Sequence, residues 1–432
     1  MNWQQLITPL RFGLEHYHTH NHDTRNEFQR DFDRLIFSAP FRRLQNKTQV
    51  FPLPGSVFVH NRLTHSLEVS CVGRSLGNNV AAALRQKYPE MTVPFDSIGE
   101  IVSAACLAHD MGNPPFGHSG EKAIQTYFSE GKGMQFQSVL SPEQWADCTH
   151  FEGNANAFRI LTHQFCGRRK GGFVLTYSTI ASVVKYPYSS LLSPKGKFGY
   201  FDSDKQNWEL ISSTLGIPEG SRFPLVYLVE AADDICYEIM DIEDAHKLRI
   251  LTTDETKQLL FAFFSDERKA RIEENMSLVS DTNEQIAYLR SCVIGCLIDA
   301  CVATFMRNEE NIINGTFNSS LVKSCTDKVR DAYRRCSRLA VDKIYRSPEV
   351  LDTELAGYKI IYILMEELMQ AVMTPDKEYS RRLLDRIPQQ YDVKSTGEYN
   401  RILAVLDYIS GMTDVYALDL YQKITGMALP KV

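Results

Sequence analysis

The stretch CLAHDMGNPPFGHSGE, residues 106–121, concentrates side chains that can bind metal ions or carry protons. His109 and Asp110 stand side by side at the end of an apolar run, and His118 and Glu121 follow with three-residue spacing. The Asn-Pro-Pro turn between the two pairs restricts the backbone and so fixes their separation. Imidazole and carboxylate groups in this arrangement could ligate a divalent ion or act as general acid and base.

Two other segments can add ligands to this stretch. In RLTHSLEVSCVGRSLGNNV, His65 continues the apolar stripe of its helix, as His109 does in its own. Asp233 falls one turn after Val229, close to the buried stripe of a third helix, where an unpaired carboxylate is costly. Together with Asp110, these residues form a nitrogen and oxygen set that suits Mn²⁺, Fe²⁺ or Mg²⁺ better than a thiolate-favouring ion.

The same residues also have a purely structural interpretation. A lone histidine at the edge of a core is usually a satisfied structural side chain. A His-Asp pair at a helix end can interact with the last turn, and Glu121 can complement the dipole of a helix that begins near Ser119. Spacing alone supports the metal site and the structural interpretation about equally.

Two further patterns lie close to these residues. Asp233, Tyr237 and Asp241 follow one another at intervals of four, so they share a helix face that leads away from the first aspartate. Taken alone, Tyr237 is more typical of a core aromatic. Arg62 lies one turn before His65, a position suited to a phosphate beside a metal ion.

Seven segments resemble the HD-domain superfamily of metal-dependent phosphohydrolases, whose signature is H…HD…D, and more narrowly the deoxyguanosinetriphosphate triphosphohydrolase-like family. They run in the family's order and span nearly the whole chain. The matching segments are DTRNEFQRDFDRLIFSAPFRRLQNKTQVFPL (23–53), NRLTHSLEV (61–69), LAHDMGNPPFGHSGE (107–121), FEGNANAFRIL (151–161), KYP (185–187), EAADDICYEIMDIEDA (230–245) and DYISGMTDVYALDLY (407–421).

The resemblance implies a metal site and a catalytic pair. A divalent ion, Mn²⁺ or Mg²⁺ with Fe²⁺ as a further candidate, would activate a water and polarise the α-phosphate. Its ligands would be His65, His109, Asp110 and Asp233. Glu121 would orient His118 and favour its protonated form, so that His118 could donate a proton to the leaving 5′ oxygen.

The resemblance also implies how substrate is held. In the family, the residues matching Tyr237 and Asp241 contact the sugar, require a free 3′-OH and disfavour ribose, and the one matching Gln49 reads the sugar. Arg62, Lys185 and Tyr186 would meet the phosphates. The remaining matches are Asn154, counted with the substrate-binding residues although its role is not assigned, and Asp414 and Tyr416, which have no assigned role.

The implied reaction is hydrolysis of deoxynucleoside triphosphates, dGTP or a broader range, to deoxynucleoside and inorganic triphosphate. The family further implies a homo-oligomer, a hexamer or tetramer, and a nucleotide or single-stranded DNA effector. Two rival classes remain: a phosphodiesterase or nuclease using the same ligands, and a catalytically silent nucleotide-binding scaffold. The PFGHSGE turn with Tyr237 and Asp241 argues against the first, and the complete ligand set argues against the second.

The bulk properties are those of an ordinary globular protein, with 44% hydrophobic and 23% charged residues. A net charge of -6 leaves no global basic field for nucleic acid. The 10 cysteines include no C-x-x-C pair, the N-terminus lacks a signal-peptide pattern, and no apolar run reaches transmembrane length. We therefore expect a reduced, cytoplasmic protein with small buried cysteines and no membrane partner.

Apolar residues recur at three- and four-residue intervals along most of the chain, which predicts an all-α HD-domain bundle. The single domain (1–432) is expected to comprise a metal-binding core (60–245) and a C-terminal helical region (246–432). An insertion near 171–203 is expected to be irregular or a hairpin, and the run of His16, His18, His20 and His22 to be a mobile, exposed segment. The predicted helices cover 62–87, 97–111, 119–130, 152–166, 222–247, 254–265, 281–306, 320–342, 349–373 and 397–426.

Overall fold

The structure is a computed structural model that describes residues 1–15, 24–51, 59–193 and 196–429. Within these ranges the chain is helical, and the β-type pairings are two isolated bridges that belong to no strand. The all-α prediction is therefore confirmed. The alternating run of His16, His18, His20 and His22 lies outside the described residues, so its role stays a prediction.

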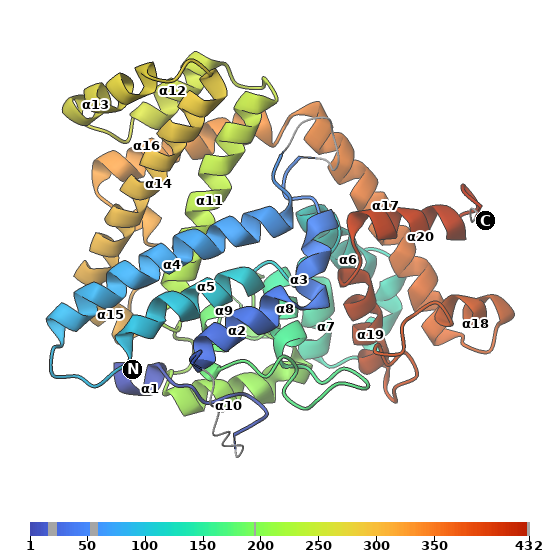
Figure 1. Cartoon of the computed structure of the whole chain (residues 1–432). Coiled ribbons are helices and arrows are strands. Elements are labelled where there is room, and N and C mark those ends of the chain that lie inside the picture. The colour runs from blue at the N-terminus through green and yellow to red at the C-terminus, as the bar shows by residue number, and fades with distance from the viewer. Residues whose placement is uncertain (16–23, 52–58, 194–195, 430–432) are drawn as a thin grey trace.

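Three long helices form the centre of the molecule (Figure 1): α4 (Arg62–Lys87), α5 (Ile98–Ala108) and α11 (Val226–Lys247). α5 is buried along nearly its whole length, as its continuous apolar sequence requires. A Cβ built on Gly77 of α4 would lie 2.7 Å from the Cα of Gly99 in α5, so these two glycines allow the helices their close approach.

The periodic segments all contain helices. Besides the central three, they hold α6 (Gly117–Ser129), α8 (Gly153–Thr162), α12 (Thr253–Phe261), α14 (Thr282–Arg307), α16 (Asp327–Leu339) and α17 (Pro348–Met373). The last segment, 397–426, is two helices rather than one: α19 (Glu398–Ser410) and α20 (Asp414–Ile424). The chain restarts there because the Thr413 side chain accepts a hydrogen bond from Tyr416 N and caps α20.

Shorter elements complete the fold. The helices are α1 (Trp3–Leu6), α2 (Glu27–Ile36), α3 (Ala39–Arg43), α7 (Pro142–Thr149), α9 (Tyr177–Val183), α10 (Lys205–Leu215), α13 (Asp266–Ser277), α15 (Glu309–Ile313) and α18 (Glu378–Leu384). The tighter turns are η1 (Leu44–Asn46), η2 (Phe95–Ser97), η3 (Lys132–Ser138), η4 (Ser190–Leu192), η5 (Asp202–Asp204) and η6 (Val322–Ser324), and one π-helical turn, η7, spans Ala340–Ile344.

The described part of the 171–203 insertion contains no hairpin. The segment is largely irregular, which was one of the two expectations. Its first part, however, contains the core helix α9, whose residues are all buried and which packs against α5. The Thr176 side chain caps this helix by accepting a hydrogen bond from Thr179 N. Short apolar runs rich in β-branched residues do not distinguish strand from helix locally, and packing on α5 decides here.

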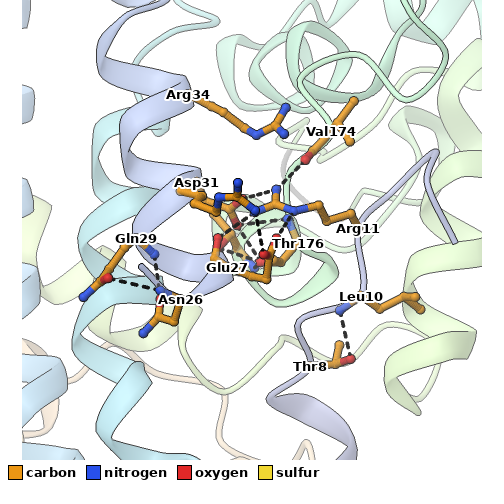
Figure 2. Close-up of polar contacts among 12 residues, drawn as sticks. Thr8, Leu10, Arg11, Asn26, Glu27, Gln29, Asp31, Arg34, Val174 and Thr176 are labelled. Carbon is orange, nitrogen blue, oxygen red and sulfur yellow. Dashed lines mark hydrogen bonds and ion pairs between the residues drawn. The ribbon is translucent and has the colours of Figure 1, made fainter. Parts of the chain in front are cut away.

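A buried ionic contact ties the N-terminal segment to α2 and to the start of the insertion (Figure 2). Arg11 Nη1 donates to Asp31 Oδ1 at 2.7 Å and to the Val174 carbonyl at 2.6 Å. Asp31 Oδ2 in turn accepts from the Thr176 amide at 2.9 Å and from its hydroxyl at 2.6 Å. The entry to α9 is thereby anchored to the core by hydrogen bonds to charged groups.

Two apolar clusters form the interior. One surrounds α4, α5 and α11, and the other joins α6 to the C-terminal helices α17, α19 and α20. Because helices from both halves of the chain share the second cluster, the packing fits a single domain. The boundaries at 60–245 and 246–432 stay a prediction.

α14 corrects one expectation about membranes. By length and composition alone it could cross a membrane. The expectation that no apolar run reaches transmembrane length did not foresee this helix, whose apolar residues are interrupted by Arg290 and Asp299. In the fold, α14 packs against α4, α11 and α12 through a face that includes Leu289, Val293 and Leu297, while its other face is partly open.

The cysteines are all free, as expected for a reduced protein. Burial, however, holds only for six of them: Cys106, Cys148, Cys236, Cys301, Cys325 and Cys336. Cys71 and Cys166 are exposed, and Cys292 and Cys296 are half-buried, because they lie on helix faces or loops that no other element covers.

Candidate metal and phosphate site

The central helices bring three of the predicted metal ligands together. His65 of α4, His109 at the end of α5 and Asp233 of α11 each offer a ligand atom, and these atoms all lie within 4.8 Å of one another. Asp233 Oδ1 lies 3.1 Å from His65 Nε2 and 3.5 Å from His109 Nε2. Residues spaced far apart in the chain thus converge because each extends the buried stripe of its own helix.

The hydrogen bonding of His109 fits a metal ligand. Its Nδ1 donates to the Cys106 carbonyl at 2.6 Å. Its Nε2 is buried and, among the described residues, has no well-formed hydrogen-bond partner. Metal-binding histidines typically donate a hydrogen bond from one ring nitrogen and keep the lone pair of the other nitrogen free for the metal.

The electrostatics of the cluster also favour a cation. Burial opposes protonation of His109, but Asp110 and Asp233 outweigh it and raise its pKa to about 9. Burial opposes ionisation of Asp233, yet His109 and His65 outweigh it and hold the pKa of that carboxyl well below its usual value. A positive charge is therefore stabilised between these groups, and a divalent ion could supply it in place of a proton.

Asp110 lies at the edge of the cluster rather than inside it. Its Oδ1 is 3.7 Å from His109 Nε2 and accepts from Asn113 Nδ2 at 2.5 Å. Its Oδ2 accepts from Arg62 Nη1 at 2.8 Å. Burial raises the pKa of Asp110, but Arg62 outweighs it and the net shift is downward. Arg62 thus pairs with this carboxylate, while its buried Nε has no partner among the described residues.

The predicted catalytic pair is held by an unusual turn. Phe116 adopts a left-handed backbone conformation, with φ of 60°, and α6 begins directly after it. His118 Nδ1 lies 2.9 Å from Glu121 Oε2, and Glu121 Oε1 accepts from the Gly153 amide at 2.8 Å. Glu121 is buried, whereas the His118 side chain is 83% exposed. The hydrogen bond that His118 donates to Glu121 raises the pKa of His118, so this acid does more than complement the helix dipole.

These groups line one cavity of about 520 Å³. All predicted site residues except His65 and Asp241 contribute to its wall. They are Gln49, Arg62, His109, Asp110, His118, Glu121, Asn154, Lys185, Tyr186, Asp233 and Tyr237.

Along α11 the predicted face leads from the metal cluster into the fold. The Tyr237 ring lies edge-on to His65, with ring centroids 6.4 Å apart. Asp241 is buried, and its Oδ2 accepts from the Tyr345 hydroxyl at 2.8 Å. Burial raises the pKa of Asp241 well above its usual value. Asp241 therefore sits behind the cavity wall, which Tyr345 helps to form.

The remaining predicted contacts also line the cavity. Lys185 Nζ lies 3.4 Å from Glu230 Oε1 and 5.8 Å from the centroid of the Tyr186 ring. Asn154 Nδ2 donates to Glu152 Oε1 at 2.6 Å. The Gln49 Oε1 is buried, and no described residue donates to it.

Several residues of the cavity wall were not predicted from the sequence, among them Lys197, Tyr345 and Asn113. Lys197 lies in the same irregular segment as the KYP motif, and its Nζ is 2.8 Å from Glu152 Oε2. Its position close to KYP could have suggested it. Tyr345 and Asn113 carried no signal for this cavity, because their places on its wall depend on how distant segments pack.

Comparison with known proteins first identifies the class of protein. The HD domain family model matches residues 62–148, and the Phosphohydrolase-associated domain model matches residues 324–423. An all-α fold with a His-His-Asp cluster between its central helices agrees with an HD-domain phosphohydrolase, a class that binds divalent metal ions.

The relatives define the family more narrowly. A deoxyguanosinetriphosphate triphosphohydrolase-like protein of Pseudomonas aeruginosa is 37% identical over 100% of both chains. One from Synechocystis is 35% identical over 99% of this chain and 100% of its own length. A deoxyguanosinetriphosphate triphosphohydrolase of Enterobacter is 29% identical over 99% and 98%. The chain belongs to the deoxyguanosinetriphosphate triphosphohydrolase-like family.

Proposed function

We propose that the protein hydrolyses deoxynucleoside triphosphates at the α-phosphate, yielding a deoxynucleoside and inorganic triphosphate. One observation carries the proposal. A single cavity contains both His109, whose Nε2 has no well-formed hydrogen-bond partner among the described residues and lies beside Asp233, and His118. Glu121 orients His118, because its two oxygens accept hydrogen bonds from His118 and from the Gly153 amide. The family names support the reaction class, and the substrate and mechanism are our inference.

We assign the metal site to His65, His109, Asp110 and Asp233. A bound divalent ion, Mn²⁺ or Mg²⁺ with Fe²⁺ as a further candidate, supplies Lewis-acid polarisation of the α-phosphate and activation of a water. Asp110 lies at the edge of this site, with its Oδ1 3.7 Å from His109 Nε2, while Arg62 holds its Oδ2. The arginine thus orients the carboxylate and offers its remaining N–H groups to phosphate oxygens.

His118 is assigned as the general acid. Its Nδ1 is engaged by Glu121, which leaves the Nε2–H free to point into the cavity. As water attacks the α-phosphorus, the bond to the 5′ oxygen breaks and that oxygen takes the proton from His118. The raised pKa of His118 favours the protonated imidazole that this role demands.

The sugar and phosphates are assigned to opposite walls of the cavity. Tyr237 lies where it can stack against the sugar, and the unpaired Gln49 Oε1 is an acceptor for a sugar hydroxyl. Asp241 acts on the sugar together with the Tyr345 hydroxyl that it binds. Lys185, Tyr186 and Asn154 line the cavity on the phosphate side.

A product assay tests the proposal. The purified chain is incubated with Mn²⁺ and each dNTP alone, then with all four, and products are separated by anion-exchange and reversed-phase chromatography. We expect deoxynucleoside and triphosphate from the wild type and none from His118→Ala. His246→Ala is the matched control, because His246 lies at the far end of α11 and hydrogen-bonds only Thr253 among the described residues.

The other outcomes of this assay separate the rival classes. Pyrophosphate with nucleoside monophosphate would replace the proposal with a phosphodiesterase. No product from any mixture, while nucleotide still binds, would indicate a silent scaffold. The same assay reveals whether dGTP or a broader dNTP range is used.

Assembly and effectors rest on the family resemblance alone. We propose a homo-oligomer, a hexamer or tetramer, and a nucleotide or single-stranded DNA effector. The cytoplasmic location is a separate proposal that rests on the scattered free cysteines. Sedimentation velocity with and without dNTP or an oligonucleotide measures the first two, and a purely monomeric chain under all conditions would contradict them.

A further inference from the structure

Asp414, the first residue of α20, matched the family pattern without an assigned role, and the structure shows what it contacts. Its side chain is buried, with 6% of the residue exposed. Oδ1 accepts from the Phe116 amide at 2.9 Å, and Oδ2 accepts from the Thr48 amide at 2.7 Å. These partners lie 298 and 366 residues away in the sequence. One carboxylate thus joins the C-terminal helices to two separate segments of the cavity wall.

Lys47 makes the complementary connection. Its side chain is buried, with 2% of the residue exposed, and its Nζ donates to the Asn113 carbonyl at 2.5 Å and to the Ser410 carbonyl at 2.7 Å. Ser410 is the last residue of α19, directly before the short connection that leads to Asp414 at the start of α20. The Lys47 carbonyl itself accepts from the amide of Arg62, at the start of α4.

Both ionisable side chains bind backbone atoms rather than each other, and burial lowers the pKa of Lys47 to about 7. In the part of the chain that the structure describes, Lys47 Nζ forms no salt bridge with a carboxylate, and Asp414 forms none with a cation. A buried charge is costly unless its hydrogen-bonding capacity is used. Two side chains whose burial costs free energy therefore bind the backbone of the turn 113–117 and of segment 47–49. We infer that the positions of these two segments are important.

The segments they hold carry assigned site residues. Phe116 has the left-handed conformation, which a residue with a side chain adopts only where its surroundings impose it. Its ring packs so closely on α17 that a Cβ on Gly357 would lie 2.4 Å from Phe116 Cγ. His118 follows Phe116 by two residues, and Gln49 follows Thr48 directly.

We propose that Asp414 and Lys47 are positioning residues that hold His118 and Gln49 in register across the cavity. The C-terminal helices thereby set the geometry of proton transfer and of sugar recognition, although they supply neither group. This inference rests on the proposed function for the roles of His118 and Gln49. A merely structural role would make Asp414 matter for stability and not for the relative rates on different sugars.

The test compares Asp414→Asn with Asp147→Asn in the full chain with Mn²⁺. Asp147 is a matched control because it is also buried, accepts from the backbone amide of Asp202 at 2.7 Å and binds Tyr399 of α19. Its partners do not line the cavity, whereas Thr48 and Phe116, the partners of Asp414, do. The measurements are Tm, kcat, KM, and the ratio of kcat/KM for a dNTP to that for its 3′-deoxy analogue.

We expect Asp414→Asn to lower kcat about 10- to 100-fold, the scale of a misplacement near 1 Å. The same variant should reduce the preference for the 3′-hydroxyl, because Gln49 is released as well. Asp147→Asn should lower Tm by a similar amount and leave kcat and the sugar preference within about twofold of the wild type, since general destabilisation does not reposition the cavity wall. Equal kinetic effects of the two variants, or a change in Tm alone for Asp414→Asn, would overturn the proposal.

A second variant guards against misfolding of the first. Lys47→Met removes the amine that donates both hydrogen bonds while keeping an unbranched side chain. It should reproduce the loss of kcat and of sugar preference, and circular dichroism checks that the helices remain. Two folded variants with wild-type kinetics would refute the positioning role.

Hydrogen exchange keeps this test separate from that of the proposed function. If the wild type releases no triphosphate, the proposed reaction fails, but the holding of the turn can still be measured. Peptides covering 113–121 and 45–51 should exchange faster in Asp414→Asn than in Asp147→Asn, because two amide acceptors are weakened. Unchanged exchange in both peptides would contradict the positioning role whatever the reaction is.

Discussion

At the scale of single residues, Glu121 shows how one carboxylate can serve both structure and chemistry. One oxygen binds the His118 imidazole and the other binds the Gly153 amide at the start of α8. Burial opposes its ionisation, but His118 outweighs this and lowers the pKa of Glu121. The pair is therefore most stable as carboxylate and imidazolium, the state in which His118 can act as an acid.

We predict that Glu121→Gln moves the alkaline limb of the pH profile of kcat/KM to lower pH. The hydrogen bond that His118 donates to the Glu121 carboxylate raises the pKa of His118, so removal of the carboxylate lowers that pKa. Because the general acid must be protonated, activity then falls at a lower pH than in the wild type. Glu130→Gln, at the other end of α6, is the control, and an alkaline limb that does not move in Glu121→Gln would count against the acid role.

A second residue-scale prediction concerns Tyr345. Tyr345→Phe removes the hydroxyl that donates to Asp241, leaving this buried acid without its partner. We expect KM for a dNTP to rise about 5- to 10-fold, the equivalent of one lost hydrogen bond, with kcat little changed. A 3′-deoxy substrate should be affected less.

Tyr227→Phe is the matched control for this change, because it removes another buried hydroxyl of the same chemistry, one that binds the Phe317 carbonyl. Equal effects of the two variants on KM would show that Tyr345 acts on stability alone.

At the scale of elements, the site depends on how α4, α5 and α11 are docked. His60, just before α4, lies 2.6 Å by its Nδ1 from Asp244 Oδ2 of α11 and 3.1 Å by its Nε2 from Glu68 Oε1. Burial opposes the charged form, but the hydrogen bonds to Asp244 and Glu68 outweigh it and raise the pKa of His60 to about 10. A protonated His60 therefore links the start of α4 to α11.

This link predicts a pH-dependent stability. The folded chain keeps the His60 proton up to about pH 10, whereas the unfolded chain loses it near its ordinary pKa of 6.5. The stabilisation is thus complete below pH 6.5 and is lost as pH rises toward 10. Urea unfolding should show the free energy of unfolding falling over this range more steeply in the wild type than in His60→Gln. Parallel curves for the two proteins would contradict the charged link.

At the scale of the whole molecule, a bound ion would join the three central helices at one point. Anything that binds the folded state alone stabilises it by mass action, by about 2.7 kcal/mol at a ligand concentration 100 times Kd. We predict that Mn²⁺ added to chelator-treated protein raises Tm, and that His109→Ala abolishes the increase, because His109 supplies the free buried nitrogen. His246→Ala should respond as the wild type does, and an equal increase in all three proteins would place the ion elsewhere.

Local pattern and resemblance account for much of the fold and of the site. The helical period places His65 and His109 at the ends of buried stripes, and the four-residue rail of α11 follows from spacing alone. These features need no knowledge of the chain path, because side-chain direction in a helix repeats with the backbone. The conformation of segment 171–203 was harder to predict from the sequence. Its short apolar run allows helix and strand equally, and burial of α9 against α5 favours the helix.

The sequence by itself determined the all-α class, the family and the residue types that meet in the cavity. The hydrogen-bond partners that orient these residues depend on the tertiary structure. Arg62 binds Asp110, Tyr345 binds Asp241, and Lys47 and Asp414 bind the backbone of the turn 113–117. Lys47 and Ser410, for example, are 363 residues apart. Such contacts carry no local periodicity, because they depend on where the packing of two apolar clusters brings distant backbone together.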